Sequence, residues 1–140
     1  MRFMILVKSD ANSEAGVLPT EAVLIKMGKF NEELVRDGVM LAGEGLHPSS
    51  KGARIDLTGA KPVVIDGPFS ETKELIGGFW IVSANSLEEV IERFKRCPSD
   101  AGTIEIRQVF SSEDFAPVIE TDAGRAVLAA EDEFRNRTHA

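Results

Sequence analysis

Two short runs of this chain contain no polar residue, and they limit the possible folds more than any other feature. Residues 3–7 read FMILV, and residues 78–82 read GFWIV. An apolar run of this length without polar alternation is typical of a β-strand that is buried on both faces of its sheet. The sequence therefore predicts one sheet that needs cover on both sides.

Two amphipathic helices are expected to supply part of that cover. The first begins after Thr20, a favoured N-cap type, and ends at Gly38, which suits a left-handed cap. The second begins at Ser86, which forms a capping-box pattern with Glu89, and Glu89 has Arg93 four residues further on. Each helix has one apolar stripe at helical spacing, formed by Val23, Met27, Phe30 and Leu34 in the first and by Leu87, Val90, Ile91 and Phe94 in the second.

The remaining strands complete an α+β domain. Residues 39–46 and 102–110 are predicted strands, and residues 53–66 form a predicted hairpin around the Gly-Ala pair at 59–60. The order strand, helix, strand, hairpin, strand, helix, strand predicts a ferredoxin-like subunit with an inserted hairpin. Right-handed crossovers place both helices on one face of such a sheet.

The other face of the sheet then needs a different cover. We expect a homodimer, in which two copies pack sheet against sheet through this open face. The rival is the tail, residues 111–140, which reads as a linker followed by a helix at 121–137, and that helix would fold under its own sheet. The chain is thus divided into a domain at 1–110 and a linker with a C-terminal helix at 111–140.

Composition argues against several classes of function. The net charge is −7 and no Lys/Arg-rich block occurs, which argues against nucleic-acid binding. No apolar run approaches the length of a membrane span, and neither a signal peptide nor a disulfide pair is present, so we expect no membrane contact and a cytoplasmic location. Zinc-ligand spacing, phosphate-binding loops and a nucleophile elbow are missing from the sequence, so no metal and no cofactor are expected, and Cys97 is interpreted as a packing residue.

The stretch DGPFSETKE at 66–74 poses the main functional question. In one interpretation Asp66 shapes a turn, since Asp bonds its own backbone, Gly accepts unusual conformations and Pro fixes the next angle. In the other interpretation Asp66 is a catalytic acid or base at the mouth of a cleft. His47 is its expected catalytic companion, because histidine exchanges protons near neutral pH; the alternative is an exposed loop residue.

Three further residues are candidates for binding a ligand. Glu44 lies within the sequence Gly-Glu-Gly, which lets a ligand approach the backbone. Ser70 and Lys73 follow the Asp66 turn, and Lys73 is suited to an anion. The alternatives are that Ser70 caps a short helical turn and that Lys73 belongs to a solvated turn.

Several of these short motifs together resemble a known family. GEGL at 43–46, DGPF at 66–69, ETKE at 71–74, GGF at 77–79 and CP at 97–98 occur in the order and approximate spacing of DGPF-domain proteins, within the YCII-related group. The resemblance covers about residues 1–110 and implies a dimeric α+β barrel. Some YCII-like proteins resemble muconolactone-type isomerases and dehalogenases with a His–Asp pair. The predicted first helix here contains no histidine, so that pair is not carried over intact.

Two functions follow from the sequence. The first is a small-molecule binder or acid–base enzyme, acting by proton transfer on a small carbonyl or lactone-like compound in a cleft near the DGPF turn. The second is a non-enzymatic regulatory module, because DGPF-domain proteins are often regarded as accessories of extracytoplasmic-function sigma factors. Its acidic surface and its tail would then engage the basic surface of a regulatory partner protein.

Overall fold

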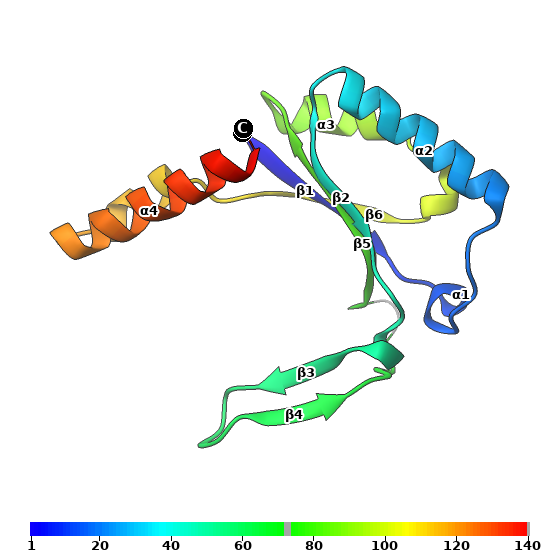
Figure 1. Ribbon diagram of the computed structural model, residues 1–140, viewed down its shortest axis with the longest axis horizontal. Coiled ribbons are helices and arrows are strands. Elements are labelled where there is room, and N and C mark those ends of the chain that lie inside the picture. The colour runs from blue at the N-terminus through cyan, green and yellow to red at the C-terminus, as the bar shows by residue number, and fades with distance from the viewer. Residues whose placement is uncertain (72–73, 140) are drawn as a thin grey trace.

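The computed structural model of the chain describes residues 1–71 and 74–139 (Figure 1). The strands are β1 (Arg2–Lys8), β2 (Met40–Gly45), β3 (Ala53–Asp56), β4 (Val63–Asp66), β5 (Ile76–Ser83) and β6 (Ile104–Gln108). The helices are α1 (Ala11–Glu14), α2 (Glu21–Arg36), α3 (Leu87–Phe94) and α4 (Asp122–His139), and the short 3-10 turns are η1 (Ser49–Lys51), η3 (Ser99–Ala101) and η4 (Ser112–Val118).

The main sheet has the order β2-β5-β1-β6, and every neighbouring pair is antiparallel. Helices α2 and α3 both cover the same face of this sheet (Figure 1). The predicted ferredoxin-like plan and the one-sided placement of the two helices are confirmed.

The core lies between this face and the two helices. Trp80 of β5 contacts Phe30 of α2 at 6.1 Å and Phe94 of α3 at 5.3 Å between ring centroids, both edge to face. Phe3 and Ile5 of β1 are fully buried beside them. On β5, Phe79 and Ile81 alternate with the buried residues and are only half-buried, so they lie on the opposite face of the sheet.

The predicted N-caps at Thr20 and Ser86 and the cap at Gly38 are confirmed. Thr20 Oγ1 accepts a hydrogen bond from the backbone N–H of Val23 at 3.3 Å, and Gly38 has a φ of 69°. At α3, Ser86 Oγ accepts from the N–H of Glu89. The Glu89 carboxylate, however, accepts from the N–H of Asn85 at 2.8 Å, one residue before the expected partner.

Arg93 departs from its predicted pairing with Glu89. Its guanidinium contacts Asp37 at 2.7 Å, at the C-terminal end of α2. Tertiary packing brings this carboxylate within reach, and the hydrogen bond from Arg93 holds the pKa of Asp37 below its usual 3.8. The pair joins the two covering helices at the surface.

The polar segment between β1 and α2 contains the one-turn helix α1. Asp10 accepts a hydrogen bond from the N–H of Ser13 at 2.7 Å, and Ser13 Oγ accepts from the N–H of Asp10 at 3.0 Å. This reciprocal cap explains a helix in such a polar segment.

The hairpin β3–β4 extends away from the main sheet (Figure 1). Ile55 pairs with Val64 in the register, as the predicted hairpin requires. Every residue of the two strands is exposed. An isolated two-stranded hairpin is marginally stable in water, so this one needs support from outside itself.

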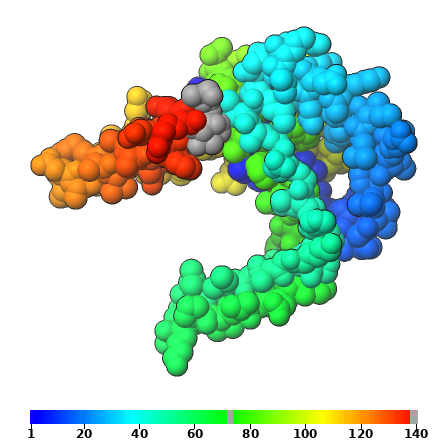
Figure 2. All heavy atoms as spheres, viewed as in Figure 1, coloured from blue at the N-terminus to red at the C-terminus, as the bar shows by residue number. Residues whose placement is uncertain are grey.

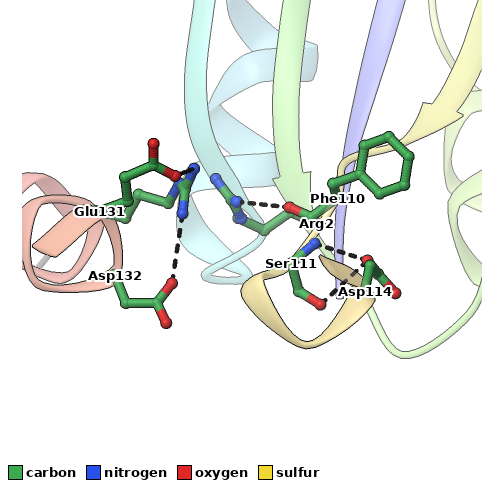
Figure 3. A network of polar contacts seen from close by, with 7 residues as sticks. Arg2, Phe110, Ser111, Asp114, Glu131 and Asp132 are labelled. Carbon is green, nitrogen blue, oxygen red and sulfur yellow. Dashed lines mark hydrogen bonds and ion pairs between the residues drawn. The ribbon is translucent and has the colours of Figure 1, made fainter. Parts of the chain in front are cut away.

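The tail leaves the opposite end of the sheet. Arg2 donates to the carbonyl of Phe110 at 3.3 Å, and Ser111 with Asp114 caps η4, where the sequence suggested only a linker (Figure 3). The predicted tail helix is confirmed as α4, and its Glu131 pairs with Arg135 at 3.1 Å.

Helix α4 packs mainly on η4. The rival interpretation, in which the tail helix lies across its own sheet, is therefore wrong. Figure 2 shows a hollow between the tail and the hairpin, on the side of the sheet away from α2 and α3. Within residues 1–71 and 74–139, no helix is both long and apolar enough to cross a membrane.

Candidate functional site

A cavity of about 700 Å³ lies between the first half of α2 and one end of the main sheet. Its walls come from α1, the segment Val17–Thr20, helix α2 and the adjoining ends of β2 and β5. The apolar side chains on the cavity side are those of Val7, Val17, Leu18, Pro19, Val23, Leu24, Met27, Trp80 and Ala101, while Phe79 belongs to the lining with its side chain on the opposite face of the sheet. Such a concave and largely apolar site with few polar groups is typical of small-molecule binding sites.

The sheet side of this cavity has no side chains at three neighbouring positions. Gly43 pairs with Trp80 in the register and Gly45 pairs with Gly78. Trp80 points to the helices, and paired residues share a face of the sheet, so all three glycines face α2. A Cβ atom at Gly78 would lie 2.9 Å from the carbonyl oxygen of Glu44, whereas one at Gly45 would meet no atom within 4 Å.

These three residues, Gly43, Gly45 and Gly78, form what we call the glycine floor. A Cβ atom at Gly43 would lie 2.5 Å from Met40 Cε, so Met40 covers that end and the floor is bare β-sheet backbone at Gly45 and Gly78. It lets a ligand lie directly against the main chain.

Asn31 and Trp80 provide the best-defined polar contact of the cavity. The indole Nε1–H of Trp80 donates to Asn31 Oδ1 at 2.8 Å. Asn31 directly follows the buried Phe30 on α2, and Trp80 belongs to β5 in the core. Both residues line the cavity, so a rigid part of the core forms one of its ends.

The charged groups around the cavity are largely paired. Lys26 contacts Asp100 at 2.8 Å, and this hydrogen bond lowers the pKa of Asp100 below its usual 3.8. The backbone N–H of Ser13 does the same for the pKa of Asp10. Lys8 lies 3.6 Å from Glu105. With their pKa values lowered, Asp10 and Asp100 are ionised at neutral pH, so they place negative charge at the rim of the cavity.

The structure places the sequence-predicted site residues in two groups. Glu44 lines the cavity, although its pairing with Phe79 directs its side chain to the opposite face of the sheet. Asp66, His47 and Ser70 are exposed and do not belong to the cavity lining. Lys73 lies outside the described residues. The convergence of Asp66, His47 and Glu44 on one cleft therefore stays a prediction.

The DGPF turn has a clear structural role. The N–H of Phe69 donates to Ser49 Oγ at 3.0 Å, and the hydroxyl and N–H of Ser49 both donate to the carboxylate of Glu14. The N–H of Gly67 donates to the carbonyl of Gly52, and any side chain at Gly67 would overlap the carbonyl of Ser49. The motif thus fixes the base of the hairpin to η1 and, through Glu14, to α1.

Sequence reasoning missed the residues that form most of the cavity. Asn31 and residues 17–19 carry no motif, and Trp80 stood out only as part of the apolar run at 78–82, which was expected to be a buried strand. The one useful signal was the Gly-Glu-Gly sequence, which suggested ligand access to the backbone. Gly43 and Gly45 do line the cavity.

No other chemistry stands out in the part of the chain that the structure describes. That part contains no group of three or more His, Cys, Asp or Glu side chains placed to hold a metal ion. Cys97 is half-buried against the core, and this burial raises the pKa of its thiol from 9.0 to about 11. The thiol is therefore protonated at neutral pH, as expected of a packing residue.

Comparison with known proteins places the chain among YCII-like sequences. The YCII-related domain model matches residues 1–113. An uncharacterized protein, R00369, of Rhizobium meliloti (strain 1021) is 31% identical over 91 residues, which cover 62% of this chain and 73% of that protein.

One solved structure is similar over most of the chain. It is the 5-chloro-2-hydroxyhydroquinone dehydrochlorinase TftG of Burkholderia phenoliruptrix AC1100, in complex with 2,5-dihydroxybenzoquinone. The match has a TM-score of 0.46 and 18% sequence identity, and it covers 81% of this chain and 98% of that chain.

Proposed function

This chain belongs to the YCII-related family, and we propose that it binds a small organic molecule in the cavity between α2 and the glycine floor. The observation that carries the proposal is the floor itself, with Trp80 beside it. Three glycines that face the covering helix leave a cavity of about 700 Å³ where ordinary side chains would fill the space. A core under selection for stability alone tends to close such a void, because a cavity costs packing energy.

A cavity-filling substitution tests this proposal. Gly45→Leu adds a side chain where a Cβ meets no atom within 4 Å, so it occupies the cavity without a backbone clash. We expect a fragment screen monitored by Trp80 fluorescence to find ligands for the natural chain and none for Gly45→Leu. Trp80 is the only tryptophan of the chain, so the signal reports on this site alone.

Gly28→Ala is the matched control for that experiment. Gly28 also has free space around its Cβ position, but it lies on α2 outside the cavity lining. This variant should keep every ligand of the natural chain. Equal ligand affinity in Gly45→Leu and the natural chain would show that the cavity is not the binding site.

We further propose that two copies pack through the uncovered sheet face. The apolar residues of this face are only half-buried within one chain; they are Met4, Leu6, Phe79 and Ile81. The hairpin and the tail both project from this side of the sheet. In this dimer Asp66 and His47 of one copy would lie near the sheet of the partner. Any acid–base role of these two residues would then concern a ligand bound on the partner's side. The single chain leaves both side chains in solvent.

Sedimentation tests the dimer. Phe79→Glu places a charge on the uncovered face and is expected to give a folded monomer, because an unpaired charge in an apolar interface is strongly unfavourable. Ile25→Glu, at an exposed position of α2, is the control and should stay dimeric. A natural chain that sediments as a monomer at micromolar concentration would exclude this interface.

A regulatory role is the second candidate, and one observation favours it. The tail exposes Val118 and Val127, at 74% and 57% of their surface, in addition to the apolar hairpin. Isolated apolar residues are common on surfaces, but a projecting helix that carries them suits a protein partner. If Val118→Glu and Val127→Glu leave both self-association and capture of a purified sigma factor unchanged, the tail has no docking role.

A further inference from the structure

We propose that the ligand of this cavity is a flat, uncharged molecule that presents a hydrogen-bond acceptor, such as a carbonyl oxygen, to the side-chain amide nitrogen of Asn31. The inference rests on the binding role proposed above and adds the class of ligand and the residue that orients it. It follows from three observations: the fixed orientation of one amide, the charges of the lining and the shape of the floor.

The orientation of the Asn31 amide is set by its neighbour. The indole nitrogen of Trp80 can only donate a hydrogen bond, so the Asn31 atom at 2.8 Å must be the acceptor Oδ1. The NH₂ group of the same amide then remains as a donor. It makes no hydrogen bond within residues 1–71 and 74–139. An acceptor atom of a ligand can therefore bond to this free NH₂ group, whereas Oδ1 already accepts from the indole N–H.

The charges of the lining exclude an anionic ligand. Lys8 is the only cationic residue among the described lining residues, and it is paired with Glu105. The acidic residues Asp10 and Asp100 also belong to the lining, and Glu44 contributes to it with its side chain on the opposite face of the sheet. A carboxylate would lose hydration on entry and would find no free cation to replace it, so the cavity favours an uncharged molecule.

The shape of the floor favours a planar molecule. Gly45 and Gly78 leave the sheet backbone bare on the α2 side, Met40 Cε lies over Gly43, and Val23 and Met27 of α2 line the cavity as well. A Cβ atom at Gly43 would lie 3.0 Å from Trp80 Cδ1, so the floor reaches the indole edge that contacts Asn31. A planar ring that lies on this floor can place an acceptor atom in its own plane next to the Asn31 amide.

Three probes of similar size separate the chemical classes: acetophenone, a neutral ketone; benzoate, an anion; and benzylamine, a cation. Binding is measured by titration of the indole N–H resonance of Trp80, the only tryptophan. In the natural chain we expect acetophenone to bind more tightly than either charged probe. Gly45→Leu is expected to abolish the response to all three.

Two substitutions test the role of Asn31. Asn31→Asp retains an oxygen for the Trp80 indole but replaces the NH₂ donor by an acceptor. We expect it to weaken acetophenone binding about tenfold and to strengthen benzylamine binding, since one neutral hydrogen bond contributes about a factor of ten. Asn31→Leu keeps the size but removes both the NH₂ donor and the acceptor of the Trp80 indole, and it should weaken acetophenone binding without strengthening benzylamine binding. An indole resonance that remains dispersed in each variant shows that the variant is folded.

The possible failures are distinguishable. If the probes bind and Gly45→Leu abolishes the response, but Asn31→Asp retains full affinity for acetophenone, the acceptor inference is wrong and the binding role stands. If benzoate binds most tightly, the uncharged class is wrong. If no probe shifts the indole resonance at millimolar concentration, or if Gly45→Leu does not change the response, both the binding role and this inference are overturned.

Discussion

The helix-covered body of this protein and its projecting hairpin are both rich in β-branched and other apolar residues, yet they differ completely in burial. In the body, Leu34 and Val82 have 0% of their surface exposed, while Val64 and Leu57 in the hairpin region expose 64% and 72%. Helices α2 and α3 cover one region, whereas the described chain leaves the other uncovered (Figure 1). Apolar character in a sequence therefore predicts a need for cover, but it does not say which molecule supplies it.

The largest expected difference between the two regions is in unfolding free energy. Leu34→Ala should destabilise the chain by about 3 kcal/mol, because it leaves a cavity in a fully packed core. Val64→Ala should change the stability by less than about 0.5 kcal/mol at low protein concentration, where the hairpin is in solvent. Urea unfolding at nanomolar concentration measures both. Equal losses for the two variants would mean that the single chain already covers its hairpin.

The junction between body and hairpin should be sensitive to one glycine. Gly67→Ala forces the new Cβ against the Ser49 carbonyl, so the hairpin base must shift, at a cost of about 2 kcal/mol. Hydrogen exchange should become faster in β3 and β4 while the amides of β1 and β5 remain protected. Gly59→Ala, in the hairpin loop, is the control, because its Cβ would meet only an atom at 3.9 Å. Unchanged hairpin exchange in Gly67→Ala would refute this role for the DGPF turn.

Gly28→Ala should stabilise the body alone. Gly28 lies inside α2, and a Cβ atom added there would meet no atom within 4 Å, so alanine adds helix propensity of about 1 kcal/mol without a clash. The expected result is a higher urea midpoint with unchanged hydrogen exchange in the hairpin. A parallel slowing of exchange in the hairpin would show that body and hairpin unfold together, which would weaken the contrast between them.

The smallest expected effect concerns pH. Arg93 lowers the pKa of Asp37 in the folded chain, so the stability from this pair is fully present above the unfolded value of 3.8. It is lost as the pH falls below 3.8 and through the lower folded value. Asp37→Asn should therefore reduce stability slightly at neutral pH and make no difference in strong acid. Asp56→Asn is the control. Asp56 lies in the hairpin and does not join two helices, so this substitution should leave the unfolding of the body unchanged.

The sequence predicted the body better than the site. The helix ends at Thr20 and Gly38 and the opposite faces of Phe79 and Trp80 were predictable, because capping and strand alternation depend on neighbouring residues. The partner of Arg93 was not, since Asp37 lies on another helix. The cavity was also unpredictable in most of its parts: Asn31 becomes a candidate only when α2 is placed over β5, and nothing local marks it.

The sequence by itself determined the strands of the main sheet, helices α2, α3 and α4, and the need of that sheet for cover on both faces, because periodicity and capping are short-range properties of the chain. Only the tertiary structure decided that the DGPF turn anchors the hairpin and that three glycines meet beside Trp80 and Asn31. These residues are distant in the sequence, and their meeting depends on the register between β2 and β5 and on the packing of α2 over them. Contacts of that kind arise from the sum of many packing interactions, and no single motif encodes them.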